Sequence, residues 1–244
     1  MPAVRIHFDL NAMWGKDLSY LTGVYFGDGS ISKDSRRETY TYGVLAVDKP
    51  FVDYCATCIK NVFGVERPVE LKSNKTSAGN SIYVVRVGAT EFGSWLLEAS
   101  GQKARIPQIV WESPLDIRLA FLAGYFDSDG TMCKRGSPKI AGVYPFGEEM
   151  AALFVYSGIR AWRHNGYTSG SGRYVWEYGL SVYDMLTVGF KPVLERKQPR
   201  QPRYREQRNP QRLYVGVPSW VQDIGRPCMK MQDASGTETT CALA

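Results

Sequence analysis

The sequence predicts an α+β protein built from two similar halves, each with the element order αββαββα. A nine-residue segment occurs twice, as LTGVYFGDG from Leu21 to Gly29 and as LAGYFDSDG from Leu122 to Gly130. Downstream of each copy, stretches rich in β-branched and aromatic residues alternate with stretches of helical spacing. A repeat of about 100 residues in a chain of 244 indicates two copies of one supersecondary unit.

The repeated segments themselves predict two helices that pack against each other. In each copy two small residues stand four positions apart, Gly23 and Gly27 in the first and Gly124 and Ser128 in the second. Residues at this spacing share one helix face, and small side chains there allow two helix backbones to approach closely. The surrounding positions are apolar, which suits burial between the two halves.

The other elements follow in the same order in both halves. In the first half we expect strands at 39–47 and 81–87, helices at 51–63 and 91–98, and a hairpin at 72–80. In the second half we expect strands at 139–144 and 174–182, helices at 148–156 and 183–195, and a hairpin at 164–172. The halves are expected to be residues 1–104 and 105–198, followed by a basic extension rich in Pro, Arg and Gln at 199–244.

The repeat also brings two carboxylates together. Asp28 and Asp129 stand 101 positions apart, each where its helix ends, and Gly29 and Gly130 follow as expected left-handed terminators. The last carbonyls of a helix carry partial negative charge, so two acids there repel each other unless a cation lies between them. Single Asp-Gly turns are common, but a matched pair at the repeat distance favours a site for a hard cation such as Mg²⁺.

Positive charge is concentrated in one segment. The 30 Lys and Arg exceed the 24 Asp and Glu by six, and the segment from Arg196 to Arg212, with seven basic residues and one acid, accounts for all of that excess. Such a segment can bind a polyanion through phosphate contacts. The alternative is a solvated tail.

Composition excludes several other classes of protein. Hydrophobic residues make up 44 % and charged residues 22 %, which excludes wholesale disorder and a coiled coil. The five cysteines are scattered, and Cys55 and Cys58 fit one face of a helix better than a zinc site. We expect an intracellular, reduced protein without a membrane span, because the sequence has neither a long apolar N-terminal segment nor an apolar run of 18 residues.

The two copies of the repeated segment resemble the motif of the LAGLIDADG homing endonucleases, in the monomeric form with two motifs on one chain. The resemblance covers Leu18 to about Gln198. It implies two αββαββα halves related by a pseudo-two-fold axis through the motif helices, with antiparallel sheets forming a saddle in the DNA major groove. It also implies a site-specific endonuclease that cuts both strands of double-stranded DNA across the minor groove and leaves 3′ overhangs.

The resemblance assigns roles to individual residues. Asp28 and Asp129 would bind Mg²⁺ or Mn²⁺ with help from the carbonyls of Gly27 and Ser128, and Ca²⁺ could bind without supporting cleavage. Asp127 occupies the first acidic position of the motif, which is structural in this family.

Basic and polar residues complete the expected site. The resemblance places Lys103 and Lys197 beside the two scissile phosphates, with Arg105 as an alternative to Lys103. Asp48 is the expected water-positioning residue of the first half, whereas the second half offers only Tyr144.

Residues that could contact DNA are spread over both expected sheets and the extension, since every second side chain of a strand faces the same way. They are Lys33, Arg36, Arg37, Tyr40, Tyr42, Lys72, Lys75 and Arg86 in the first half; Lys134, Arg135, Lys139, Arg163, Arg173 and Glu177 in the second; and Arg200 and Arg203 in the extension.

Two other functions use the same fold. One is an RNA maturase that binds its own intron RNA, and the other is a DNA-binding regulator that does not cleave. The joint presence of Asp28, Asp129, Lys103 and Lys197 favours the nuclease. The nuclease could be encoded in an intron, be free-standing or derive from an intein.

Overall fold

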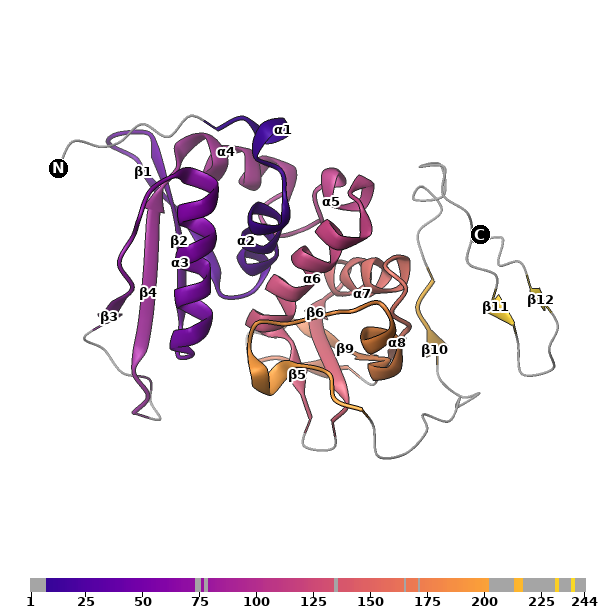
Figure 1. Cartoon of the computed structure of the whole chain (residues 1–244). Helices are drawn as coiled ribbons and strands as arrows, with labels where there is room; N and C mark the ends of the chain where they lie inside the picture. The colour runs from indigo at the N-terminus through magenta and orange to yellow at the C-terminus, as the bar shows by residue number, and fades with distance from the viewer. Residues whose placement is uncertain are drawn as a thin grey trace.

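The computed structural model describes residues 8–72, 76, 79–133, 136–164, 166–170, 172–201 and 215–216, and the backbone of 213–214, 231–232 and 238–239. Two mixed α and β halves lie on either side of a central pair of helices, α2 (Lys16–Phe26) and α6 (Leu115–Asp129) (Figure 1). The strands pair antiparallel in both halves. The α+β prediction is therefore confirmed.

The first half contains a four-stranded sheet covered by helices on one face. Its elements are α1 (Leu10–Met13), α2, β1 (Gly29–Asp34), β2 (Thr39–Ala46), α3 (Lys49–Phe63), β3 (Glu70–Lys72), β4 (Ile82–Gly88) and α4 (Thr90–Ala99). The strand order is β1-β2-β4-β3, and α3 and α4 pack against the two central strands. Cys55 and Cys58 are buried on α3, as their spacing predicted.

The second half repeats this plan with differences at its end. Its elements are α5 (Gln108–Glu112), α6, β5 (Thr131–Met132), β6 (Pro138–Val143), α7 (Phe146–Tyr156), β7 (Ala161–Arg163), β8 (Tyr167–Thr168), β9 (Tyr174–Leu180), α8 (Val182–Thr187) and the 3-10 turn η1 (Glu195–Lys197). The helix predicted at 183–195 is wrong beyond Thr187, because Gly189 adopts a positive φ of 71° and Pro192 follows it.

A strand from the C-terminal extension joins the second sheet. β10 (Leu213–Tyr214) pairs with β7, so the order along the sheet is β10-β7-β9-β6-β5, with β8 also on β9. The backbone N–H of Val215 donates to the carbonyl of Ala161 at 3.0 Å. Two further short strands, β11 (Met231–Gln232) and β12 (Glu238–Thr239), pair with each other.

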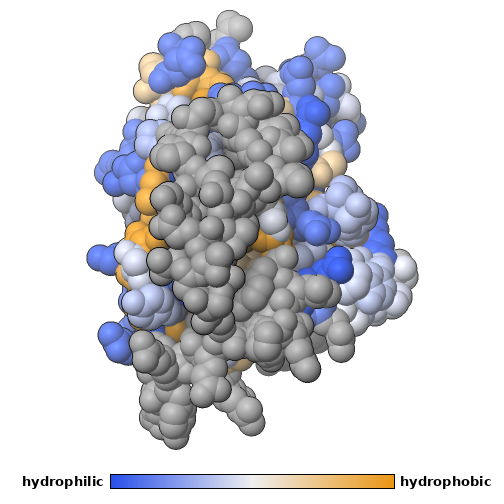
Figure 2. Space-filling model, turned by 90° about the vertical axis from the view of Figure 1, so that its right-hand side faces the viewer, coloured by the Kyte–Doolittle hydropathy of each residue, from blue (hydrophilic) through white to orange (hydrophobic). Residues whose placement is uncertain are grey.

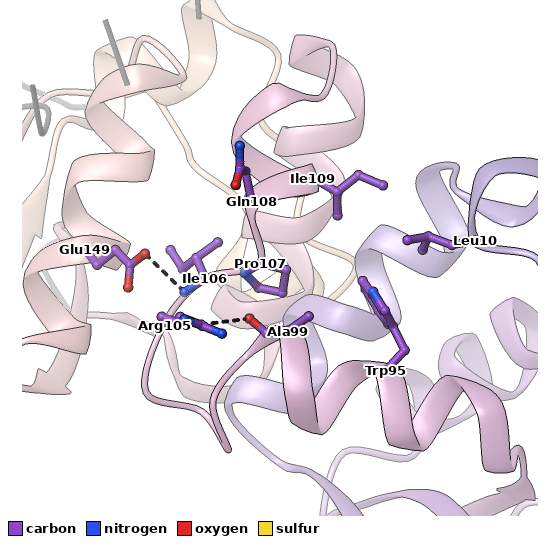
Figure 3. A pocket seen from close by; sticks show the side chains of 9 residues that line it. All are labelled: Leu10, Trp95, Ala99, Arg105, Ile106, Pro107, Gln108, Ile109 and Glu149. Atoms are coloured by element: carbon purple, nitrogen blue, oxygen red, sulfur yellow. Dashed lines mark hydrogen bonds between the residues drawn. The ribbon is translucent and has the colours of Figure 1, made fainter. Parts of the chain in front are cut away.

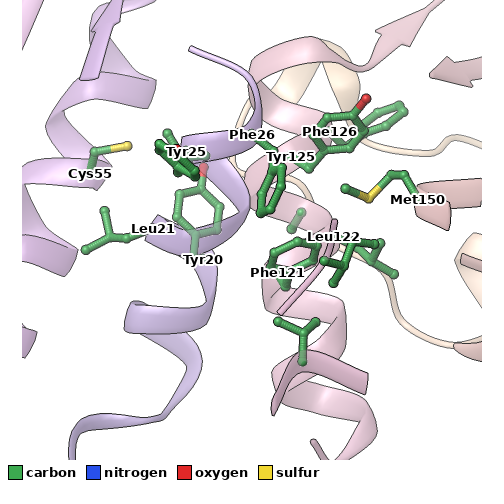
Figure 4. Close-up of a cluster of buried hydrophobic side chains, with 14 of the residues drawn as sticks. Tyr20, Leu21, Tyr25, Phe26, Cys55, Phe121, Leu122, Tyr125, Phe126 and Met150 are labelled. Atoms are coloured by element: carbon green, nitrogen blue, oxygen red, sulfur yellow. The ribbon is translucent and has the colours of Figure 1, made fainter. Parts of the chain in front are cut away.

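The two motif helices pack with their backbones in contact, as the small residues predicted. A Cβ added at Gly23 would overlap the carbonyl oxygen of Phe121, and one added at Gly124 would overlap that of Tyr20. Large rings then fill the space around this contact (Figure 4). The close approach of the two helix backbones therefore requires glycine at positions 23 and 124, independently of helix propensity.

The glycines that close the motifs are not in the left-handed conformation that we expected. Gly130 has φ −70° and ψ 154°, and Gly29 is not among the glycines of positive φ. A Cβ on Gly130 would overlap the ring of Phe126. Tight packing explains these glycines better than turn geometry does.

Seen from the side of the second half, the coloured part of the surface is mainly hydrophilic, with small hydrophobic areas between (Figure 2). Among the helices of the described residues, none is long and apolar enough to cross a membrane.

Candidate functional site

Asp28 and Asp129 lie at neighbouring ends of α2 and α6. Asp28 follows Gly27, the C-cap of α2, and Asp129 is the last residue of α6. Each residue is partly covered by the protein but keeps solvent-exposed surface. A Cβ added at Gly27 would lie 3.2 Å from the carboxyl carbon of Asp129, so the second acid lies directly beside the residue that precedes the first.

The electrostatics of the two acids favour a cation. Partial burial, followed by the Asp129 carboxylate, raises the pKa of Asp28 to about 6. Partial burial also raises the pKa of Asp129, while Lys103 and Lys197 oppose the rise. A divalent cation between the carboxylates would relieve their repulsion, and hard oxygen donors of this kind suit Mg²⁺ or Mn²⁺.

The protein itself offers few further metal ligands. In the described parts of the chain, three or more His, Cys, Asp or Glu side chains do not gather at any point where they could hold a metal ion. The two carboxylates fit a metal that also takes oxygens from water and from a phosphate, which is the usual arrangement for Mg²⁺ at such sites.

A lysine bonds the end of each motif helix. Nζ of Lys103 donates to the carbonyls of Gly27 at 3.1 Å and Gly29 at 2.9 Å. Nζ of Lys197 donates to three carbonyls at the end of α6, those of Phe126 at 3.0 Å, Asp127 at 2.6 Å and Ser128 at 3.2 Å. Each ammonium group thus offsets the negative end of one helix dipole.

These bonds change the expected roles of the two carbonyls. The carbonyls of Gly27 and Ser128, expected to help hold the metals, each already accept a hydrogen bond from a lysine. Each keeps one lone pair for another ligand. Burial lowers the pKa of both lysines, to about 8 for Lys197, against the opposing effect of the nearby acids.

Arg105, the alternative to Lys103, contacts a different helix end. Its Nε donates to the carbonyl of Ala99 at 3.2 Å, so its guanidinium group caps the end of α4. It also lines a pocket of about 510 Å³ with Trp95, Ile106 and Glu149, between α1, α4, α5 and α7 (Figure 3). The contacts of Lys103 with Gly27 and Gly29 place it at the end of α2, whereas those of Arg105 place it at the end of α4.

Asp127 is structural. Its buried carboxylate accepts hydrogen bonds from the hydroxyl of Tyr20 at 2.9 Å and from the backbone N–H groups of Val193 at 2.7 Å and Leu194 at 3.0 Å. It therefore connects α2 to residues 193–194, which precede Lys197 in the chain. Phe26, at the equivalent position of the first motif, instead stacks on the ring of Phe146, with 5.0 Å between centroids.

Asp48 is paired with a residue that sequence reasoning missed. It precedes α3, and Arg196 donates to it with 2.6 Å between Nη2 and Oδ2. The charge of Asp48 acts on both Asp28 and Lys197, so it lies within electrostatic reach of the site. Only the position of Arg196 next to Lys197 in the basic segment could have indicated this role.

In the first sheet, the candidate DNA contacts fall on both faces. Ser30, Gly43 and Arg86 share the face away from the helices, because a Cβ on Gly43 would touch both side chains. Lys72 lies on the same face, opposite Ile82. Arg36 and Arg37 are exposed in the turn between β1 and β2.

Three candidates of that sheet lie on its helix-covered face. Tyr42 is 0 % exposed and donates its hydroxyl to the carbonyl of Leu21 at 2.8 Å, so its assignment to DNA contact is wrong. Tyr40 packs beside Gly93 of α4, and Nζ of Lys33 lies 5.7 Å from the centre of the Tyr40 ring. Strand alternation places all three on the side of the core.

In the second sheet, Lys139 and Glu177 share the face away from α7 and form an ion pair of 3.1 Å. Arg163 lies on the other face, with its guanidinium 4.5 Å from the centre of the Trp176 ring. Arg173 and Arg200 are exposed in loops. The remaining candidates, Lys75, Lys134, Arg135 and Arg203, lie outside the described residues.

Comparison with known sequences gives limited matches. No family model matches the chain. A stretch of 114 residues is 29 % identical to the uncharacterized protein MJ0398 of Methanocaldococcus jannaschii, covering 47 % of this chain and 38 % of the relative. A stretch of 149 residues is 30 % identical to the replication factor C small subunit of the same organism, covering 60 % of this chain and 7 % of the relative. The chain thus spans well under half the length of these relatives.

The two halves around paired motif helices define the homing endonuclease fold, and this chain has the fold of the LAGLIDADG homing endonucleases. Among solved structures it is similar to mesophilic variants of the homing endonuclease I-DmoI, with a TM-score of 0.53, 15 % identity, and coverage of 73 % of this chain and 95 % of that one. It is also similar to I-DmoI in complex with DNA and Mn, with a TM-score of 0.51, 14 % identity, and coverage of 73 % and 96 %.

Proposed function

We propose that this chain is a monomeric, site-specific DNA endonuclease that cuts both strands of a long asymmetric target across the minor groove and leaves 3′ overhangs. The observation that carries the proposal is the pair of exposed carboxylates, Asp28 and Asp129, at adjacent ends of two helices whose backbones touch. The shared fold with I-DmoI, whose structures include complexes with DNA and with Mn or Ca, supports it.

The side chains around the acids suit phosphodiester hydrolysis. Asp28 and Asp129 would hold Mg²⁺ or Mn²⁺, which polarises a phosphate and activates a water when bound. The two lysines keep positive charge beside the carboxylates, and an ammonium group within reach of a phosphate would offset charge that builds up on it. Asp48, held by Arg196, can accept a hydrogen bond from water near Asp28.

DNA recognition would use the faces of the two sheets that the helices leave uncovered. Arg86 and Lys72 in the first sheet and Lys139 and Glu177 in the second have the donors and acceptors that base edges require. Arg200 and Arg203, in the basic segment, would add phosphate contacts. Because the two sheets carry different side chains, the target would be asymmetric.

The test is cleavage of a randomised or genomic DNA library with Mg²⁺, with double-strand ends mapped by sequencing. The Asp28→Asn, Asp129→Asn double variant runs beside the wild type, with Asp53→Asn on α3 as a matched control. Recurrent breaks at one long sequence with 3′ overhangs, lost only in the double variant, are the expected result. Specific binding to DNA or intron RNA without recurrent breaks would contradict the proposal and favour a regulator or a maturase.

A further inference from the structure

The two site lysines differ in their surroundings, although their sequence positions are equivalent. Building on the proposed endonuclease function, we propose that Lys103 contacts the phosphate of one DNA strand, whereas Lys197 is a positioning residue that fixes the end of α6 and the Asp129 carboxylate. The division rests on exposure, on the number of carbonyls bonded and on backbone conformation.

The side chain of Lys197 is buried and fixed by hydrogen bonds. It is 3 % exposed, and its ammonium group bonds three successive carbonyls of the last turn of α6. Its backbone lies in η1, and the preceding residues Val193 and Leu194 are bonded to Asp127 of the same helix turn. Moving this ammonium toward a phosphate would remove the donor to the carbonyl of buried Asp127, which is costly, whereas the carbonyl of Phe126 also accepts from the N–H of Gly130.

Lys103 is held more loosely. It is half-buried, and its ammonium group bonds two carbonyls and lies 4.9 Å from the centre of the Tyr25 ring. One of those carbonyls belongs to Gly27, which is itself half-buried and borders the exposed Asp28. Water or a metal ion can replace the ammonium group at Gly27, whereas the second carbonyl belongs to the buried Gly29.

The backbone at Lys103 lies in a hydrogen-bonded turn that ends α4, in which the N–H of Gln102 donates to the carbonyl of Leu97 at 3.0 Å. Gly101, Gln102 and Lys103 have φ values of 54°, 57° and 72°, so three successive residues are left-handed. This conformation is unfavourable for non-glycine side chains, and such strain concentrates at functional sites. The turn brings the side chain of Lys103 back to the end of α2, beside the acids.

The consequence is unequal cutting of the two strands. The Lys103 ammonium group contacts the phosphate of one DNA strand only, and that strand is therefore cut faster. Wild-type cleavage then passes through an intermediate in which this strand alone is nicked. Loss of Lys103 should slow one strand, and loss of Lys197 should act on the fold and on metal affinity.

The experiment compares Lys103→Met and Lys197→Met, with Lys191→Met at an exposed lysine as the control. Thermal unfolding is followed without DNA, and cleavage is followed on a target labelled separately in each strand. We expect Lys103→Met to change Tm by less than about 2 °C and to slow one strand at least about tenfold, leaving the other within about threefold. The control should change neither measurement.

For Lys197→Met we expect a Tm lower by about 5 °C or more. At saturating Mg²⁺ and a temperature where the variant is folded, both strands should be cut within about threefold of the wild-type rates, but half-maximal cutting should need at least about threefold more Mg²⁺. Lys197→Arg keeps N–H donors for the carbonyls at the end of α6, so its Tm and Mg²⁺ requirement should match those of the wild type. If Lys197→Met does not fold, Lys197→Arg is the variant that tests the role of Lys197.

Two results would overturn the proposal. One is an unchanged Tm in Lys197→Met together with loss of cutting on one strand, which would make the lysines equivalent. The other is equal slowing of both strands in Lys103→Met. If the wild type binds its target but cuts neither strand, the proposed endonuclease function itself fails, a result separate from the Tm comparison, which needs no DNA.

Discussion

Arg196 of the second half forms an ion pair with Asp48 of the first half, with 2.6 Å between Nη2 and Oδ2. The pair joins η1 to the start of α3 across the junction of the halves, and its members are 59 % and 29 % exposed. Such an exposed pair contributes little to stability. The pair fixes the position of a carboxylate whose charge acts on Asp28.

We expect Asp48→Asn and Arg196→Gln each to lower the free energy of unfolding by less than about 1 kcal/mol, because the pair is solvated. Asp48→Asn should slow the cutting of one DNA strand. Arg196→Gln should slow the cutting of the same strand by a smaller factor. Urea unfolding and strand-labelled cleavage check both effects. Unchanged cutting in Asp48→Asn would remove Asp48 from the site.

A methyl group at Gly23 should force the motif helices apart. Its Cβ would overlap the carbonyl oxygen of Phe121, a backbone atom that cannot move alone. We expect Gly23→Ala to destabilise the fold by about 3 kcal/mol, near the upper end for overpacking. Gly88→Ala is the control, since its Cβ would meet nothing within 4 Å. Equal unfolding free energies for the two variants would contradict the close contact of α2 and α6.

The pair of acids should make stability depend on pH in the absence of metal. The pKa of Asp28 is raised to about 6, from about 3.9 in an unfolded chain, so the folded state holds the proton more tightly. The resulting stabilisation is complete below about pH 4 and is lost as the pH rises through about 6. The Asp28→Asn variant should lose less stability as the pH rises through about 6. Its Tm at pH 7 should therefore be higher than that of the wild type.

Divalent metal should reverse that difference. Thermal unfolding with and without Mg²⁺ between pH 4.5 and 7.5 measures both effects, and wild type alone should gain Tm from Mg²⁺ above about pH 6. Identical pH profiles for wild type and Asp28→Asn would argue against coupled carboxylates.

Asp127 should matter for stability more than for chemistry. Asp127→Ala leaves the N–H groups of Val193 and Leu194 without their acceptor, and we expect a loss of about 3 kcal/mol. Tyr20→Phe removes one donor only and should cost about 1 kcal/mol. Urea unfolding of both variants gives these values. A larger loss for Tyr20→Phe than for Asp127→Ala would be inconsistent with this network.

The left-handed turn before Lys103 should respond to glycine. Gln102 is exposed with a φ of 57°, so Gln102→Gly should raise stability by about 0.5–1 kcal/mol through relief of strain. Gln198, with a φ of −66°, is the control, and Gln198→Gly should not stabilise. Cleavage by Gln102→Gly should stay within about twofold if glycine keeps the turn in place.

The sequence predicted the motif helices, the two acids and the longer strands because each leaves a local pattern. Short polar strands such as β1 and β3 leave no such local pattern in the sequence, because most of their side chains are exposed and they pair through backbone groups. The assignment of Tyr42 to DNA contact is wrong because its side chain lies on the same strand face as the buried Val44, on the side of the core.

Other features depend on contacts between distant parts of the chain. The burial of Lys197 follows from docking of the 193–197 segment on Asp127, and Asp48 meets a partner 148 positions away. The end of α8 near Gly189 was missed because apolar residues continue at helical spacing beyond it.

The pairing of β10 with β7 has a consequence for the order in which the chain folds during synthesis. The first sheet needs only residues 29–88, so it can close while most of the second half is still untranslated. The second sheet gains its last strand only when residues 213–214 emerge. Until then the edge of β7 has unpaired backbone groups, which leaves an additional sheet edge of the nascent chain open to pairing with another molecule.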